Sequence, residues 1–198
     1  MALIISADDI KQTMPEYDPG QSHLVHAKSA KLADALYAKA MNEAKFHDVV
    51  LLSSGAASGK TEFMSEYLAQ QPYIVLDGTL PTFKGASIKI AKAIKRKKHV
   101  VIVAVWPADL KVAFAAFLQR ERKYPDEHFY KTHSLSRRAL LEIAESNLPV
   151  DIKLYENHFE GDGLAFYEYE FESKAQLIEK LKDSQYTEQD IIDIITQS

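Results

Sequence analysis

The segment with the clearest capacity for chemistry is a loop of small residues that ends in a lysine and a threonine, Ser54-Gly55-Ala56-Ala57-Ser58-Gly59-Lys60-Thr61. Backbone N–H groups in such a loop point around a phosphate, and the small residues let the anion approach closely. Lys60 would reach the β- and γ-phosphates of ATP, and the hydroxyl of Thr61 would ligate Mg²⁺. Ser54 occupies the position where the standard pattern begins with glycine, and Gly55 follows it. The loop predicts a site for ATP and Mg²⁺.

A carboxylate follows the next apolar run, Tyr73-Ile74-Val75-Leu76, at Asp77. Ligands of open α/β sheets bind at the carboxyl ends of the strands, where Asp77 and Thr79 are expected. Asp77 is a candidate base for an acceptor hydroxyl and a candidate Mg²⁺ ligand, either directly or through water. An aspartate that caps the turn before Gly78 is the structural alternative.

Arginines follow the segment after Pro107. Arg120 and Arg122 are expected at the end of a helix, where a planar guanidinium can pair with phosphate oxygens as part of a lid. A basic helix end is the alternative. A second polar group on the following helix consists of His133, Arg137 and Arg138. These side chains are expected to face either the site or the solvent.

Strands and helices alternate along the chain in the order expected for a doubly wound sheet. Strands are predicted near 48–53, 73–77, 99–105 and 150–155, with helices near 60–70, 86–97, 108–122 and 134–147. The fold class is therefore predicted as α/β, with a P-loop NTPase or kinase-like parallel sheet and helices on both faces. Residues 1–46 form a helical N-terminal segment, with a helix from about His26 to Asn42, that is a candidate for substrate binding. Residues 47–198 form the kinase core, with a last strand at 164–171 and two C-terminal helices.

Composition excludes several classes of protein. The 198 residues contain no cysteine, which rules out disulfides and thiolate metal sites and favours a cytoplasmic location. The 24 basic and 28 acidic residues give a net charge of −4, which argues against non-specific binding of nucleic acid. No apolar run approaches the length of a membrane span, and the N-terminus is too acidic for a signal peptide.

The chain resembles the zeta-toxin group of P-loop kinases over roughly residues 5–157. Asp77-Gly78-Thr79-Leu80 is similar to the acidic-Gly-Thr motif of that family, and the stretch from Val101 to Arg120 is similar to its strand, proline turn and lid helix. Arg122, before Pro125-Asp126-Glu127-His128, is similar to the second lid arginine. The resemblance implies an ATP-dependent kinase that transfers the γ-phosphate to a hydroxyl of a small molecule. For the toxins the acceptor is a nucleotide sugar, UDP-N-acetylglucosamine.

The same resemblance leaves two candidates for the base. The segment Ile5-Ser6-Ala7-Asp8-Asp9-Ile10 resembles the family segment that supplies the catalytic aspartate, but it precedes the phosphate loop instead of following it. Asp8 therefore matches by local pattern and Asp77 by its position after the loop, with Asp77 favoured for contact with the metal or the acceptor. The resemblance also implies that His26 and Thr79 contact the acceptor and that Asn157 lies near the adenine.

An alternative function uses the same loop. The protein would be an ATP-binding module, or one component of a toxin–antitoxin pair, that binds ATP without transferring phosphate. An antitoxin protein would then be its partner. The serine at position 54 is the feature of the sequence that favours this alternative.

Overall fold

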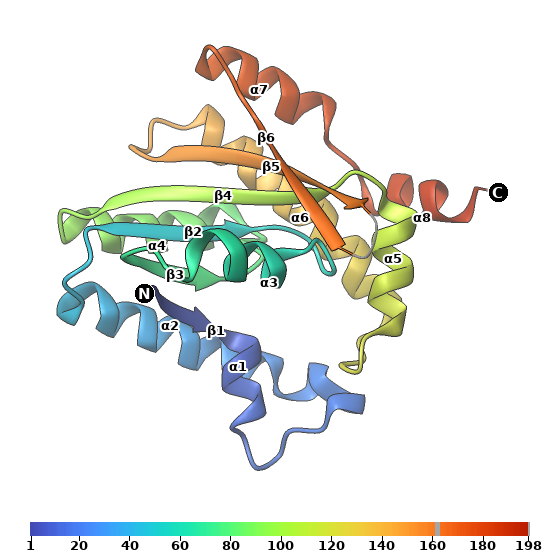
Figure 1. Ribbon diagram of the computed structural model, residues 1–198, viewed down its shortest axis with the longest axis horizontal. Helices are drawn as coiled ribbons and strands as arrows, with labels where there is room; N and C mark the ends of the chain where they lie inside the picture. Colours follow the sequence, from blue (N-terminus) through green and yellow to red (C-terminus); the bar gives the residue numbers. More distant parts are fainter. Residues whose placement is uncertain (161–162, 198) are drawn as a thin grey trace.

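A six-stranded sheet forms the centre of the computed structural model, which describes residues 1–160 and 163–197 (Figure 1). The strand order is β1-β3-β2-β4-β5-β6. The first five strands are parallel, and β6 runs antiparallel to β5. Their bounds are β1 Leu3–Ser6, β2 Asp48–Ser53, β3 Tyr73–Asp77, β4 His99–Pro107, β5 Asp151–Glu160 and β6 Gly163–Tyr169.

Strand β1 was not predicted. It has four residues and lies at one edge of the sheet, where it pairs with β3 and brings Ser6 opposite Asp77. An apolar run this short, exposed at Leu3 and Ile4, does not carry enough alternation to be recognised as a strand. The N-terminal segment therefore contributes to the central sheet. It then continues through α1 (Ala7–Gln12), a 3₁₀ segment (Pro19–Val25) and α2 (His26–Glu43) before it enters β2.

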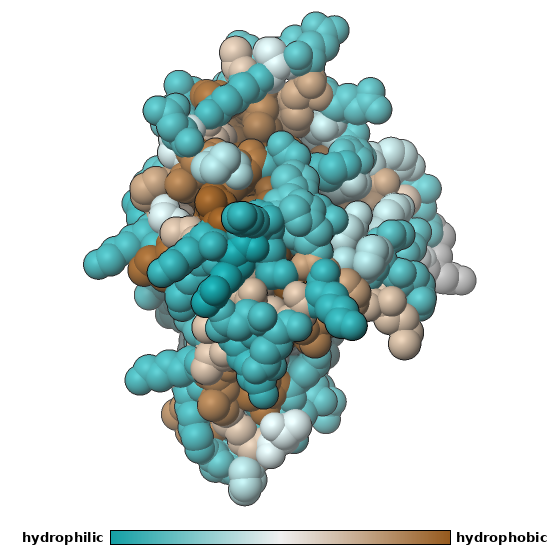
Figure 2. Space-filling view, turned by 90° about the vertical axis from the view of Figure 1, so that its left-hand side faces the viewer, coloured by the Kyte–Doolittle hydropathy of each residue, from teal (hydrophilic) through white to brown (hydrophobic). Residues whose placement is uncertain are grey.

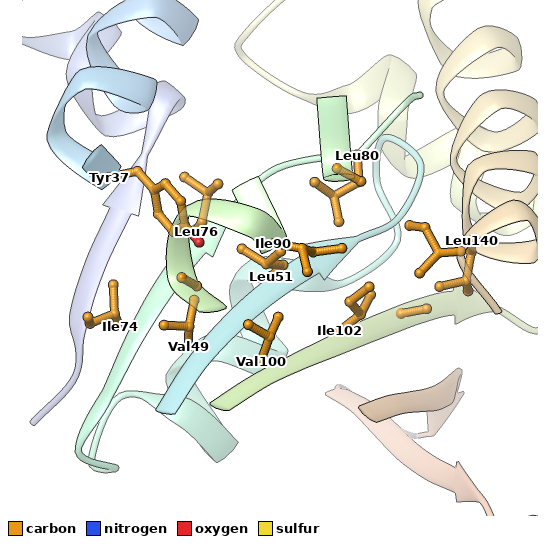
Figure 3. Close-up of a cluster of buried hydrophobic side chains, with 14 of the residues drawn as sticks. Tyr37, Val49, Leu51, Ile74, Leu76, Leu80, Ile90, Val100, Ile102 and Leu140 are labelled. Atoms are coloured by element: carbon orange, nitrogen blue, oxygen red, sulfur yellow. The ribbon is translucent and has the colours of Figure 1, made fainter. Parts of the chain in front are cut away.

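Helices cover both faces of the sheet, which confirms the predicted fold class. On one face the core includes Tyr37 of α2, Ile90 of α4 (Phe83–Lys95) and Leu140 of α6 (Asp126–Glu145), packed on side chains from the strands (Figure 3). On the other face, α3 (Lys60–Phe63) and the π-helical turn Met64–Leu68 bury Phe63 and other apolar side chains against Val50 and Val103. Strand β2 is apolar on both faces because both are covered, as is usual for central parallel strands.

Two helix predictions were wrong at their ends. Helix α5 (Leu110–Gln119) is shorter than the predicted 108–122, because Asp109 caps its start and the backbone is extended at Arg120. Helix α6 begins at Asp126 rather than near 134, directly after Pro125 and with acidic residues in its first turn. Arg120 and Arg122 consequently lie in the loop between these two helices and not in a helix.

The C-terminal elements follow the sequence prediction more closely. Helix α7 (Lys174–Asp183) packs on α6, and α8 (Glu188–Thr196) packs on α5 and α6. The predicted capping box at the start of α8 is present, because Thr187 Oγ1 accepts from the backbone of Asp190 while the Asp190 carboxylate accepts from the backbone of Thr187.

The surface at the amino ends of the central strands is mostly hydrophilic, with smaller apolar patches between polar side chains (Figure 2). Within the described ranges, none of the helices combines the length and the apolar character that crossing a membrane requires. The cavity described next lies at the opposite, carboxyl end of the strands.

Candidate functional site

The phosphate-loop segment joins the end of β2 to the start of α3. Two of its residues have left-handed backbone conformations, Ala57 with φ of 56° and Gly59 with φ of 74°. Glycine adopts this conformation without strain, and a side chain at position 59 would also come within 3.0 Å of Leu164 and 3.1 Å of Asn157. The tight turn before Lys60 therefore requires the glycine of the Gly-Lys-Thr sequence.

Ser54 is a buried anchor of the loop. Its hydroxyl donates to the carbonyl of Ser53 at 2.6 Å and accepts from the backbone N–H of Val105 at 3.0 Å. The residue that replaces the first glycine of the standard pattern thus ties the loop to β4 and fits without exposure to solvent. The departure from the pattern at this position is compatible with an ordered loop.

Helix α6 supports the loop from the other side. The backbone N–H of Ala56 donates to Thr132 Oγ1 at 3.0 Å, and Nε2 of His133 donates to the carbonyl of Ala56 at 2.8 Å. Burial lowers the pKa of His133 to about 3, with the charge of Arg137 acting in the same direction, so the ring is neutral. Sequence reasoning assigned no such role to Thr132 or His133, because both follow the loop by more than 70 residues and no local signal links them to it.

The ring of His133 lies so close to Gly55 that a Cβ atom there would be 2.3 Å from three of its ring atoms. We expect Gly55→Ala to displace the loop or the helix and to lower the free energy of unfolding by about 1–3 kcal/mol. Affinity for ATP should fall as well. The matched control is Gly163→Ala, where a Cβ would meet nothing within 4 Å. Urea unfolding of both variants checks the prediction, and equal stability would contradict it.

The buried neutral state of His133 also gives stability a pH dependence. The unfolded chain binds a proton at this residue near its ordinary pKa of 6.5, whereas the folded protein binds it only near 3. The contribution is therefore complete above pH 6.5 and is lost as the pH falls towards 3, at no more than about 1.4 kcal/mol per pH unit. We expect the unfolding free energy of His133→Gln to decline less steeply between pH 6.5 and 4.5 than that of the wild type. Parallel slopes would contradict this.

Lys60 lies over the loop, half-buried, with Nζ donating to the carbonyl of Gly55 at 2.9 Å. Burial lowers its pKa, while the carboxylates of Asp77 and Asp8 oppose that effect. The hydroxyl of Ser58 also donates to the carbonyl of Gly55, at 3.0 Å. These contacts place one ammonium group at the centre of the loop and two carboxylates close to it.

Asn157, within β5, holds the loop from the neighbouring part of the sheet. Its side-chain amide donates to the carbonyl of Ser58 at 2.6 Å, and the residue is 4% exposed. The resemblance implied that Asn157 lies near the adenine, whereas in this structure its side chain is hydrogen-bonded to the phosphate loop.

The two candidate bases lie at the carboxyl ends of neighbouring strands, although one precedes the loop in sequence and the other follows it. Asp77 is the last residue of β3, and Asp8 lies in the first turn of α1, directly after β1. Asp77 accepts from the hydroxyl of Ser6 at 3.0 Å. Burial raises the pKa of Asp77 above its usual value, partly opposed by Lys60 and Ser6. The arrangement in the sheet therefore brings Asp8 and Asp77 together despite their order in the chain.

Asp8 is the more accessible of the two carboxylates and carries two ion pairs. One oxygen is 2.7 Å from Nζ of Lys11, and the other is 2.7 Å from a terminal nitrogen of Arg122. Burial alone would raise the pKa of Asp8, but the hydrogen bond and charge of Lys11, with Arg122 and Lys60, hold it below its usual value. Asp8 is thus ionised at neutral pH and is held by one of the two predicted lid arginines.

A cavity of about 570 Å³ opens beside the loop and brings most of the predicted residues together. Ten of them line it: Asp8, His26, Ala56, Ser58, Lys60, Thr61, Asp77, Thr79, Arg120 and Arg122. The other four, Gly55, Ala57, Gly59 and Asn157, lie in or against the loop without lining this cavity. Thr61 and Asp77 supply the oxygen donors that Mg²⁺ prefers, so the residues present fit that ion.

An aromatic group that sequence reasoning missed forms another part of the wall. The rings of Tyr124 and His128 are stacked with centroids 4.3 Å apart, and His26 meets both edge-on. Lys11, fully buried, donates to the hydroxyl of Tyr124 as well as to Asp8. The loop after α5 is thereby tied to α1, a contact across 113 residues that no local pattern could indicate.

Comparison with known proteins identifies the fold. No protein-family model matches the chain, and no curated protein matches it. Similar chains occur in crystal structures of the AvrRxo1-ORF1:AvrRxo1-ORF2 complex. The match to the structure with sulphate ions has 13% identity and a TM-score of 0.53, and it covers 76% of this chain and 68% of that one.

Two further structures of that complex give the same result. The native complex matches with 14% identity and a TM-score of 0.51, covering 87% of this chain and 76% of the other. The complex with ATP matches with 13% identity and a TM-score of 0.50, and the match covers 91% of this chain and 77% of that one. At these identities the likeness establishes a shared fold, and function has to be argued from the site itself.

Proposed function

We propose that this protein is an ATP-dependent kinase that transfers the γ-phosphate of ATP to a hydroxyl of a small molecule. The observation that carries the proposal is the cavity wall on which Lys60 of the phosphate loop, the carboxylates of Asp8 and Asp77, and the lid arginines meet. Phosphoryl transfer requires such a combination, because cations stabilise charge on the moving group while a carboxylate orients the acceptor.

The geometry supports a separate role for each carboxylate. Asp8 is ionised and its side chain is 39% exposed, which suits a base that orients and deprotonates the acceptor hydroxyl. Asp77 and Thr61 would hold Mg²⁺, which when bound neutralises charge on the β- and γ-phosphates. Lys60 would contact the same phosphates, and Arg120 and Arg122 would close over them from the loop after α5.

The resemblance to zeta toxins supports a nucleotide sugar as one class of acceptor. Thr79 and His26 line the cavity, and they are the residues proposed to contact the acceptor. Burial lowers the pKa of His26, so its ring is neutral and can both donate and accept hydrogen bonds to a sugar hydroxyl. The stacked Tyr124 and His128 offer an apolar surface beside it.

ATP binding is the first test of this proposal. One neighbouring complex was crystallised with ATP, and we expect calorimetry with Mg²⁺ and ATP to show saturable binding to this chain. Nucleotide sugars, nucleosides and antibiotics would then be incubated with the protein and ATP, and phosphorylated products detected by mass spectrometry. Absence of any heat of binding to Mg²⁺-ATP would overturn the proposal.

A second candidate function is an ATP-binding component of a two-protein assembly without phosphoryl transfer. The three structural neighbours described above are chains from complexes of two different proteins, which supports a protein partner such as an antitoxin. The acceptor screen separates the two functions. A protein with the second function would bind ATP but would yield no phosphorylated product with any acceptor.

A further inference from the structure

A second cavity of about 370 Å³ is lined by residues from the carboxyl-terminal parts of β4 and β5 and from helices α5, α6, α7 and α8. None of the residues that line it lines the cavity beside the phosphate loop. Its wall includes the single tryptophan of the chain, Trp106, together with Tyr186 and the side chain of Arg137. The proposed kinase reaction uses none of these residues.

Arg137 is the unusual feature of this cavity. It is 3% exposed, and its guanidinium lies between two aromatic rings, 4.1 Å from the centroid of Trp106 and 5.0 Å from that of Tyr186. A guanidinium has five N–H donors. Within the described residues, one hydrogen bond is formed, from a terminal nitrogen to the carbonyl of Ser184 at 3.2 Å, and Nε has no partner.

No carboxylate forms an ion pair with Arg137 within 4.0 Å among the described residues, although the charge of Glu156 acts on it from a greater distance. Glu156 lines the same cavity, but its two oxygens accept from Tyr169 at 2.9 Å and contact His158 at 3.0 Å. Asp109 lines it as well, and its carboxylate caps the start of α5. Burial lowers the pKa of Arg137 to about 10, so the group stays charged at neutral pH.

Two lysines add to the positive charge of the cavity. Lys180 lies 4.5 Å over the ring of Tyr169, and Lys111 donates to the carbonyl of Gln197 at 2.5 Å. Neither forms an ion pair within the part of the chain that the structure describes. A buried cation is costly unless an anion pairs with it, and a guanidinium can bind an oxyanion through two N–H donors.

We propose that this cavity is a second binding site, separate from the phosphate loop, that takes a small oxyanion such as a phosphate or carboxylate group. Arg137 provides the paired N–H donors, and Lys180 and Lys111 provide additional charge. The indole N–H of Trp106, close to the Arg137 guanidinium, is buried without a hydrogen-bond partner among the described residues. The volume of the cavity admits a metabolite of modest size that carries such a group.

The position of Trp106 makes the site directly measurable. Because it is the only tryptophan and its ring packs on Arg137, its fluorescence reports on binding at this cavity. Inorganic phosphate would be titrated into the protein, with sodium chloride at equal ionic strength as the reference, and acetate would be titrated in a parallel series. We expect a saturable change in emission with phosphate, with acetate or with both.

Variants separate this site from the phosphate loop. Arg137→Gln and Lys180→Ala should each weaken oxyanion binding by about tenfold or more. Lys182→Ala is the control for Lys180→Ala, because Lys182 lies on the same helix and pairs with Glu145 at 3.1 Å outside the cavity. Lys60→Ala should leave the fluorescence titration with phosphate or acetate unchanged, even if this variant no longer binds ATP.

Circular dichroism establishes that each variant is folded. If Arg137→Gln does not fold, Lys180→Ala and Lys111→Ala carry the test, since both side chains lie at the rim and are not part of the core. The proposal is overturned if neither phosphate nor acetate changes the emission beyond the chloride reference. It is also overturned if the folded variants at positions 137, 180 and 111 bind with the affinity of the wild type, or if Lys60→Ala removes the signal.

Discussion

Lys60→Ala is expected to lower the turnover number for phosphoryl transfer by a factor on the order of 10²–10³. The ammonium lies at the centre of the loop, with no other lysine in contact with the carbonyl of Gly55 among the described residues. Removing one preorganised donor to the charge that develops in a transition state has an effect of this size in other enzymes. Steady-state rates with saturating ATP and acceptor measure it.

The control for this experiment is Lys39→Ala. Lys39 is exposed on α2 and pairs with Glu43 at 3.8 Å, so its loss changes the net charge of the protein by the same amount without touching the loop. Thermal unfolding of both variants distinguishes lost chemistry from lost structure. A Lys60→Ala protein that remains folded and turns over as fast as the wild type would remove the proposed role of this residue.

The parts of the site that could be predicted are those encoded within a few neighbouring residues. A buried strand, a run of small residues, Gly59 and Lys60 follow one another directly, and so do the apolar residues of β3 and Asp77. Each element is specified by local alternation, apolar content or backbone conformation, and the parallel sheet follows from the way strands and helices alternate.

The parts that could not be predicted depend on contacts between distant segments. The supports of the loop come from Thr132 and His133 on α6, and the ring of His133 explains why position 55 has no side chain. The pairing of β1 with β3 explains why the two aspartate motifs can meet although one precedes the phosphate loop in sequence and the other follows it. The strand that precedes the loop lies beside β3 in the sheet. The spacing of these residues along the sequence does not indicate either contact.

Asp8→Asn is expected to lower turnover by a factor on the order of 10²–10⁴, the range for loss of a general base, with the affinity for ATP close to that of the wild type. The neutral amide keeps the shape of the carboxylate but accepts no proton. Because Lys11 and Arg122 help to hold the pKa of Asp8 below its ordinary value of 3.8, the wild-type rate should not fall through protonation of Asp8 until the pH is below that value.

Asp77→Asn should behave differently, because the proposed role of this carboxylate is to hold Mg²⁺. The variant should require a higher concentration of Mg²⁺ for half-maximal rate, and saturating Mg²⁺ should recover part of the turnover. The raised pKa of the Asp77 carboxyl adds a pH signature: as the pH falls towards that pKa, the wild type should need more Mg²⁺, since a proton competes with the metal at this group. A Mg²⁺-dependent defect in Asp8→Asn, with a Mg²⁺-independent loss in Asp77→Asn, would reverse the two assignments, because a base acts on the acceptor and a metal ligand acts on the bound nucleotide.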